Sequence, residues 1–212
     1  MGRGKFITVE GIEGVGKSTN IEFLSSLIEA KGFDVLRSRE PGGTPMAEQI
    51  RTMLLEHGDE PLPDIAELLL FFAARSLHVC NMIKPALEAG TWVVCDRFTD
   101  ASRAYQGRGR GLDMQTIDTL SDWVQNGLEP DLTILLDAPA DVGMGRARKR
   151  GTADRLESEQ SSFYNRVREG YLALAAAQPE RFAVVDASKP LDAVQQQMRR
   201  AMSRLLGDKV HL

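Results

Sequence analysis

The chain has 212 residues, of which 42% are hydrophobic and 26% are charged, a balance ordinary for a soluble globular protein. That length favours one compact domain over residues 1–212. The formal net charge of −4 gives the chain no overall basic field that would collect nucleic acid or an anionic membrane. Any affinity for phosphate groups must therefore come from a local site.

Cysteine usage and the N-terminal sequence indicate the compartment. Cys80 and Cys95 lie among apolar residues without metal-ligand spacing, which predicts two buried, reduced thiols. The N-terminus has no apolar signal-peptide core, and no segment approaches transmembrane length. We therefore expect a cytoplasmic protein with no nucleic acid and no membrane among its partners.

Hydrophobic spacing and turn residues divide the chain into alternating strands and helices. The pattern predicts, in chain order, a strand at Phe6–Val9, a helix at Lys17–Ala30, a strand at Asp34–Arg37, a helix from Pro45 onward, a helix at Pro63–Glu88 and a strand at Thr91–Asp96. It then predicts a helix at Asp113–Gln125, a strand at Leu132–Asp137, helices at Pro139–Arg148 and Ser158–Gln178, a strand at Phe182–Asp186 and a helix at Leu191–Leu206. Thr44 before Pro45 is typical of an N-cap followed by proline at the first helical position.

Strands that alternate with helices favour a parallel sheet with helices on both faces. Such strands are buried on both sides, which agrees with their continuous apolar runs. No internal repeat, low-complexity tract or linker interrupts the pattern. We therefore predict an α/β fold of three layers around a five-stranded parallel sheet, in a single domain.

The segment between the first strand and the first helix carries a strong motif. Gly11 to Ser18 match G-x-x-x-x-G-K-[ST] in full, between the strand and the helix that this P-loop motif requires. Its glycines let backbone N–H groups converge on an anion at the positive end of the helix dipole. The fold class is then a P-loop NTPase, and the predicted ATP-binding residues are Gly11, Ile12, Glu13, Gly14, Val15, Gly16, Lys17, Ser18 and Thr19.

Three side chains near this loop predict magnesium-assisted phosphate chemistry. Lys17 would reach the β- and γ-phosphates, and the Ser18 hydroxyl would ligate Mg²⁺. Asp96, at the end of the third predicted strand, is a candidate for the carboxylate that holds the water shell of the metal. A helix or turn cap is the alternative role of Asp96.

The P-loop alone leaves the class of protein open. A nucleotide switch such as a GTPase reads guanine with Asn-Lys-x-Asp and senses the γ-phosphate with Asp-x-x-Gly, and this chain contains neither segment. A large ATPase would carry more chain around the core. A kinase of small acceptors needs a second phosphate site and a basic lid, and candidates for both are present.

Several sequence blocks resemble those of thymidylate kinases of the bacterial type. They occur in family order and are Glu10–Thr19, Arg39–Thr44, Leu70–Arg75, Asp96–Phe98, Ala104–Gly107, Arg146–Gly151 and Asp154–Glu157. Glu-Pro-Gly-Gly-Thr and Ala-Tyr-Gln-Gly discriminate this family from adenylate and guanylate kinases. The resemblance implies that dTMP is phosphorylated to dTDP with ATP and Mg²⁺, and that the protein is a homodimer.

The resemblance also assigns a dTMP site. Its residues are Glu13, Glu40, Pro41, Phe71, Arg75, Arg97, Ser102, Tyr105 and Gln106. By resemblance, Glu13 contacts the 3′-hydroxyl, Arg97 clamps the 5′-phosphate and Tyr105 crowds the 2′ position. Phe71 stacks on the pyrimidine, and Arg75 donates to O4, which rejects cytosine. The family often has Tyr or His where this chain has Phe98, so the role of Phe98 is open.

A basic cluster implies the lid. Arg146, Arg148, Lys149 and Arg150 precede Gly151, and the lid is expected over about residues 146–157. The other subtype carries a basic residue in the P-loop where this chain has Gly14, so the lid arginines would meet the transferring phosphoryl group. Arg150 and Arg155 are the candidates that join Lys17 and Arg97 as catalytic residues.

Overall fold

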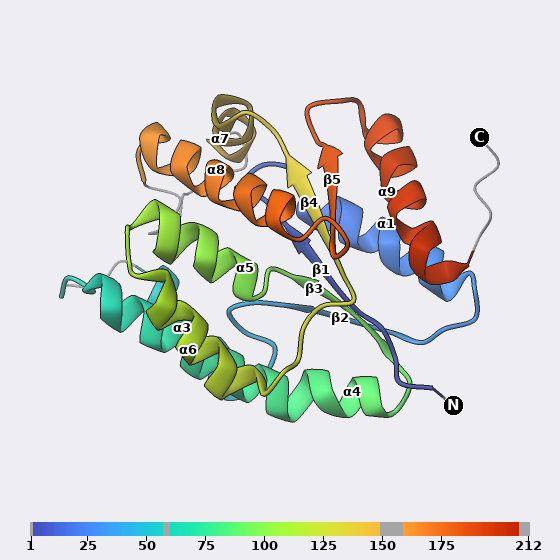
Figure 1. The fold of residues 1–212 in the computed structure, drawn as a ribbon, viewed down its shortest axis with the longest axis horizontal. Helices are drawn as coiled ribbons and strands as arrows, with labels where there is room; N and C mark the ends of the chain where they lie inside the picture. The colour runs from blue at the N-terminus through green and yellow to red at the C-terminus, as the bar shows by residue number, and fades with distance from the viewer. Residues whose placement is uncertain (1, 57–59, 149–158, 208–212) are drawn as a thin grey trace.

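Five parallel strands form the centre of the molecule (Figure 1). The computed structural model describes residues 2–56, 60–148 and 159–207. The strands are β1 Phe6–Glu10, β2 Val35–Arg39, β3 Trp92–Asp96, β4 Leu132–Asp137 and β5 Phe182–Asp186, in the order β2-β3-β1-β4-β5. Val9 pairs with Asp96 on one side and with Ile134 on the other. The predicted five-stranded parallel sheet is thus confirmed, and its carboxyl ends meet at one edge.

Helices cover both faces of the sheet (Figure 1). They are α1 Lys17–Glu29, α2 Pro45–Leu55, α3 Asp64–His78, α4 Lys84–Glu88, α5 Thr99–Ser102, α6 Met114–Gln125, α7 Ala140–Arg148, α8 Ser161–Ala177 and α9 Leu191–Leu206. Helices α1 and α9 lie on one side, whereas α4, α5 and α8 lie on the other, with α3 and α6 farther out. The Thr44 side chain accepts from the N–H of Ala47, which confirms the predicted N-cap of α2.

Two π-helical segments depart from the predicted pattern. The helix predicted at Pro63–Glu88 exists, but the π-segment η1, Val79–Ile83, joins α3 to α4. A second π-segment, η2 at Arg103–Gly109, continues α5 in a stretch where the sequence pattern predicts no helix. Hydrophobic periodicity near 3.6 residues does not signal such turns, which depend on tertiary packing.

The continuous helical stretch Asp64–Glu88 corrects another expectation. It is 25 residues long and, by length and composition alone, apolar enough to cross a membrane. However, it carries Glu67, Arg75 and His78 as buried side chains that pair within the protein. Buried charged and polar side chains that pair within the protein are expected of a core helix rather than of a lipid-facing one.

The two cysteines differ in their surroundings. Cys95 in β3 is buried, as predicted, whereas Cys80 is exposed, so that part of the prediction is wrong. Cys80 lies in η1, whose buried residues Val79 and Ile83 face the core. The apolar neighbours of Cys80 in the sequence therefore occupy one side of the helix and leave the thiol on the other.

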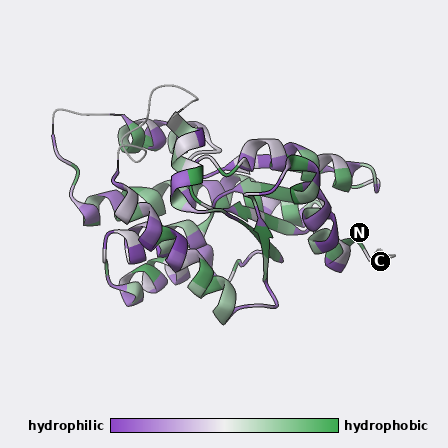
Figure 2. Ribbon diagram, turned by 90° about the horizontal axis from the view of Figure 1, so that it is seen from above, coloured by the Kyte–Doolittle hydropathy of each residue, from purple (hydrophilic) through white to green (hydrophobic). Residues whose placement is uncertain are grey.

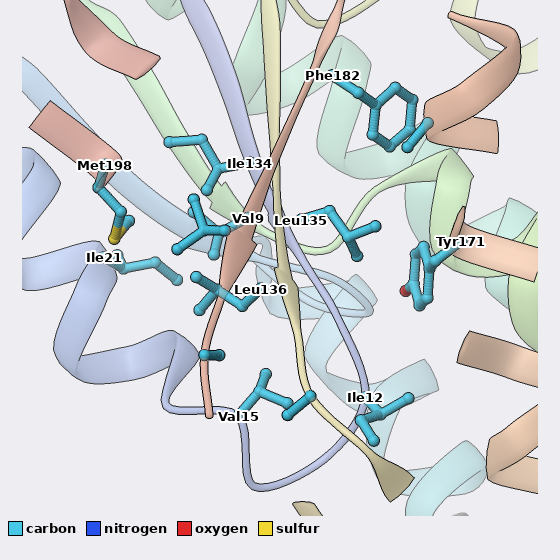
Figure 3. Close-up of a cluster of buried hydrophobic side chains, with 14 of the residues drawn as sticks. Val9, Ile12, Val15, Ile21, Ile134, Leu135, Leu136, Tyr171, Phe182 and Met198 are labelled. Carbon is cyan, nitrogen blue, oxygen red and sulfur yellow. The ribbon is translucent and has the colours of Figure 1, made fainter. Parts of the chain in front are cut away.

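Successive side chains of the strands enter the core on opposite faces of the sheet, and the core extends under the P-loop. Figure 2 shows hydrophobic strands at the centre and mixed polarity on the surrounding helices. In Figure 3, Ile134 of β4 lies near Ile21 and Met198, whereas its neighbour Leu135 faces Tyr171 on the other side of the sheet. Strands buried on both faces explain why the predicted runs were continuously apolar.

Candidate active site

The P-loop joins the carboxyl end of β1 to α1 and is shaped by glycine. Gly11, Gly14 and Gly16 have φ of 135°, 74° and 88°, values that favour residues without a Cβ. Between them, the side chains of Ile12 and Val15 are 2% and 3% exposed and anchor the loop in the core (Figure 3). The loop is therefore fixed from below while its backbone faces the cleft.

Gly14 also lies against α7. A Cβ at Gly14 would collide with the carbonyl oxygen of Gly143, and a Cβ at Gly143 would lie 2.5 Å from the carbonyl oxygen of Glu13. The missing basic side chain at position 14 therefore has a local packing reason. It does not by itself require a compensating cation in the lid.

Lys17 opens α1 and lies beside the loop carbonyls. Its Nζ donates to the carbonyl oxygens of Gly11 at 3.3 Å and Ile12 at 3.1 Å. Burial, and then the charge of Arg97, lower the pKa of Lys17 below its ordinary value. The cation is thus held at the place where the motif predicts phosphate oxygens.

Asp96 ends β3 next to the P-loop and faces the same cleft as Ser18. Its Oδ1 is buried without a hydrogen-bond partner in the described residues. A buried carboxylate oxygen without a partner, in a cleft that a serine also lines, suits Mg²⁺, which prefers hard oxygen ligands and fills its other positions with water and phosphate. The residues present therefore fit the predicted ion.

Arg97 follows β3 and converges with two other predicted residues. Its Nη1 donates to the carbonyl oxygen of Gly11 at 2.8 Å, and its Nη2 donates to Oε1 of Glu13 at 2.8 Å. The Tyr105 hydroxyl donates to Oε2 of the same carboxylate at 2.7 Å, and the Arg97 guanidinium lies 4.8 Å above the Tyr105 ring. The φ of Arg97 is +68°, an uncommon value for a side chain of this size.

The buried carboxylate of Glu10 supports Arg97 through the backbone of Phe98 and the Tyr171 hydroxyl. Glu10 accepts from the backbone N–H of Phe98 and from the Tyr171 hydroxyl, both at 2.7 Å, and that hydroxyl also accepts from Arg97 Nη1 at 3.2 Å. Burial, and then the charge of Asp100, raise the pKa of Glu10 to about 8. The surrounding bonds thus fix the unusual backbone of Arg97.

Arg75 projects from α3 into the opposite wall of the cleft. Its Nε donates to Oε2 of Glu40 at 2.6 Å. Its Nη1 and Nη2 both donate to Ser102 Oγ at 3.1 Å, and Nη2 also donates to the carbonyl oxygen of Phe98 at 3.2 Å. The guanidinium also lies 5.4 Å from the centre of the Phe98 ring. Phe71, one helical turn before Arg75, is half-buried at the cleft surface, as expected for a stacking surface.

One cleft of about 210 Å³ joins the two walls. The predicted residues that line it are Glu13, Gly14, Gly16, Lys17, Ser18, Glu40, Pro41, Phe71, Arg75, Asp96, Arg97, Ser102, Tyr105 and Gln106. Gly11, Ile12, Val15 and Thr19 do not line it, and the first three support the loop from within. Arg150, Arg155 and most of the expected lid lie outside the described residues.

Sequence patterns missed part of the lining, namely Arg39, Arg51, Leu55, Phe98 and Ala101. Phe98 is 1% exposed and packs edge-on against Phe6 with ring centres 4.9 Å apart, so its ring is part of the core beneath Arg75. Arg51 donates to the carbonyl oxygen of Pro41 at 2.7 Å. A single basic residue in a helix does not show from the sequence that its side chain lines a cleft.

A P-loop on the central strand of a parallel sheet, with helices on both faces, defines the class of P-loop NTPases. The family model described as thymidylate kinase matches residues 9–198. The thymidylate kinase of Methylococcus capsulatus is 56% identical over 98% of this chain and 99% of its own length. That of Chromohalobacter salexigens is 58% identical over 91% of this chain and 92% of its own. The chain therefore belongs to the thymidylate kinase family.

A solved structure agrees with this assignment. The crystal structure of thymidylate kinase from Ehrlichia chaffeensis superposes with a TM-score of 0.75 at 32% identity, and the match covers 94% of this chain and 99% of that one. The predicted P-loop fold is thereby confirmed over nearly the full length.

Proposed function

We propose that this protein transfers the γ-phosphoryl group of ATP to dTMP and forms dTDP and ADP. One observation carries the proposal: a single cleft is lined by the P-loop residues Lys17 and Ser18, by Arg97 bonded to that loop, and by Phe71 and Arg75 of α3. A donor site and an acceptor site that share one cleft suit direct transfer between two bound nucleotides. The assignment to the family supports the same acceptor.

Phosphoryl transfer requires positioning and charge stabilisation more than covalent chemistry. The P-loop amides and Lys17 would hold the phosphates of ATP, and the planar fork of Arg97 would hold the 5′-phosphate of dTMP. An oxygen of that phosphate attacks the γ-phosphorus, and the bond from the γ-phosphorus to the bridging oxygen of ADP breaks. The acceptor phosphate is already ionised at neutral pH, so no side chain is needed as a base.

The wall around Arg75 would select the base. A guanidinium that donates to O4 accepts thymine or uracil, whereas cytosine presents an amine at the same position and leaves a buried donor unpaired. Tyr105 would crowd a 2′-hydroxyl, and Glu13 would accept from the 3′-hydroxyl. Ser102, Pro41 and Gln106 complete the proposed acceptor site.

Ser18 and Asp96 would hold Mg²⁺, which when bound neutralises charge on the phosphate oxygens. The lid over about residues 146–157, with Arg150 and Arg155, remains a prediction from resemblance. A cytoplasmic location and the lack of nucleic-acid and membrane partners are further parts of the proposal, supported by the acidic net charge of −4.

We also propose a homodimer. Five of the large hydrophobic side chains that are exposed in the described residues lie on three helices that pack together, α2, α3 and α6. They are Met46, Met53, Ile65, Leu69 and Trp123. Exposed apolar residues gathered on neighbouring helices are common at subunit interfaces.

A coupled assay of ADP release tests the proposed reaction. We expect high kcat/KM with dTMP, lower values with dUMP, and little activity with dCMP, dAMP and dGMP. ADP release that does not depend on any nucleotide acceptor would favour the alternative of a P-loop switch or ATPase and would contradict the proposal.

A further inference from the structure

His78 ends α3 next to the base-reading wall, and nothing in the motifs assigns it a role. Its imidazole is fully buried, with an exposed fraction of 0%. Its Nδ1 lies 3.0 Å from Oε1 of Glu40, and its Nε2 lies 2.6 Å from Oγ of Ser38 in β2. The ring therefore links the sheet to the carboxylate that holds Arg75.

The direction of these bonds follows from the donors and acceptors. Glu40, ion-paired with Arg75, can only accept, so Nδ1 of His78 carries the hydrogen and donates to it. The Nε2 lies within hydrogen-bond distance of the Ser38 hydroxyl, which holds the other side of the ring. A continuous chain results, in which Ser38 orients His78, His78 orients Glu40, and Glu40 orients Arg75.

Each oxygen of Glu40 has a different partner. Oε2 accepts from Nε of Arg75 at 2.6 Å, while Oε1 accepts from His78. Without His78, the carboxylate could rotate about its last bond and carry the Arg75 guanidinium with it. With His78 in place, both oxygens are fixed, and Glu40 holds Nε of Arg75 while Ser102 and the Phe98 carbonyl hold its Nη atoms.

The surroundings leave room for this ring in one orientation. A Cβ at Gly43 would lie 2.5 Å from Cδ2 and 2.6 Å from Nε2 of His78, so the ring fits because position 43 is glycine. Gly43 belongs to the Glu-Pro-Gly-Gly-Thr block, which also contains Glu40. The block thus supplies both the carboxylate and the space for its partner.

We propose that His78, oriented by Ser38, is a positioning residue for base selection, which sets the Arg75 guanidinium for the O4 edge of thymine. The inference rests on the proposed function, because it concerns how the same site chooses its acceptor. His78 touches no substrate in this proposal. Its effect should therefore appear in the choice between dTMP and dCMP rather than in the use of ATP.

The test compares kcat/KM for dTMP with kcat/KM for dCMP in the wild type and in His78→Leu, His78→Asn and Ser38→Ala. The asparagine amide can donate to Glu40 in place of Nδ1, whereas leucine cannot. We expect His78→Leu to lower the dTMP-to-dCMP ratio about tenfold, since a hydrogen bond to a charged group is lost. Ser38→Ala should lower it by a smaller factor, and His78→Asn should keep it within about twofold of the wild type.

Val79→Ala is the matched control for lost packing, since Val79 is the next residue and is also 0% exposed. It should lower the melting temperature without changing the ratio, and KM for ATP should stay unchanged in all four variants. A folded His78→Leu protein with the wild-type ratio, or a loss in His78→Asn as large as in His78→Leu, would overturn the inference. Should His78→Leu not fold, an unchanged ratio in Ser38→Ala would overturn it.

The wild-type measurement separates this inference from the proposed function. A wild type without dTMP-dependent ADP release overturns the proposed function. A wild type that prefers dTMP, together with variants that keep its preference, overturns only the role of His78.

Discussion

Lys17, which lines the cleft, and Glu10, which is buried beneath it, show how single side chains are held before any substrate binds. Lys17 bonds to two carbonyls of its own loop, and Glu10 supports Arg97 through Tyr171 and through the backbone of Phe98. One group is expected to act on phosphate directly, whereas the other acts through its neighbours. Substitutions at the two positions should therefore have different signatures.

Lys17→Ala should lower kcat by a factor of about 10² or more, because the cation that stabilises charge on the transferred group is lost. The melting temperature should change little, since Lys17 bonds only to two carbonyls of its own loop in the contacts described. Steady-state kinetics at saturating dTMP and a melting curve measure both effects. Lys189→Ala, which is not among the residues that line the cleft, is the control, and wild-type kcat in folded Lys17→Ala would contradict the P-loop assignment.

Glu10 should make stability depend on pH. Its pKa is raised from the ordinary 4.5 to about 8, so the folded state binds the proton more tightly than the unfolded state does. The contribution is complete below about pH 4.5 and is lost as pH rises towards 8. Glu10→Gln cannot ionise, so its free energy of unfolding should fall less than that of the wild type between pH 5 and 9.

Urea unfolding of both proteins across this range provides the measurement. Other titrating groups are shared, so the difference between the two curves isolates Glu10. Parallel curves would show that the carboxyl is not held in its neutral form by burial.

At the scale of elements, local signals predicted most of the fold. The five strands follow from continuous apolar runs. Gly32 marks the end of α1, Thr44 caps the start of α2, and helical spacing predicts α9. The π-segment Arg103–Gly109 could not be predicted, because its two glycines and polar residues show no helical pattern. Its shape depends on packing: a Cβ at Gly109 would meet the ring of Phe163 in α8.

The candidate site divides in the same way. The P-loop was predicted from its motif, and Arg75 and Arg97 from family blocks. Glu10, Tyr171 and His78 were not assigned, because a residue that acts through another has no spacing of its own in the sequence. Their roles depend on contacts between segments that are far apart along the chain, such as Glu10 with Tyr171.

The contact between α7 and the P-loop makes an element-scale prediction. Gly143→Ala would place a methyl group 2.5 Å from the carbonyl oxygen of Glu13 and 3.0 Å from Cδ1 of Ile12. We expect a loss of about 1–3 kcal/mol in the free energy of unfolding and a higher KM for ATP, because the loop must shift. Gly145→Ala lies on the same helix with nothing within 4 Å of its Cβ.

The control should gain about 0.5–1 kcal/mol, since alanine is the better helix former. Urea unfolding and ATP titration of both variants measure the difference. Equal effects of the two substitutions would contradict a tight contact between α7 and the loop.

At the scale of the whole molecule, the proposed dimer can be tested by introducing one charged side chain on the exposed apolar surface. Leu69→Glu introduces a carboxylate where the side chain is 51% exposed on α3, and it should shift the wild-type dimer towards monomer, because a buried unpaired charge is unfavourable. Leu191→Glu on α9, where the leucine is 48% exposed, should leave the dimer intact. Sedimentation velocity at matched concentrations gives the result, and a monomeric wild type at micromolar concentration would contradict the proposed dimer.

The ion pair between Arg97 and Glu13 affects which anions can compete with the substrate for this cleft. Cells contain abundant small anions, and a bare guanidinium in a cleft would bind them. Here an internal counter-ion already faces the cation at 2.8 Å, so an arriving anion must compete with a carboxylate. Inorganic phosphate brings nothing that Glu13 can accept in return at the sugar position, whereas a deoxynucleotide brings a 3′-hydroxyl. The pair thus favours anions that, besides the phosphate held by Arg97, carry a hydrogen-bond donor at the sugar position, and free phosphate should be a poor competitor of dTMP.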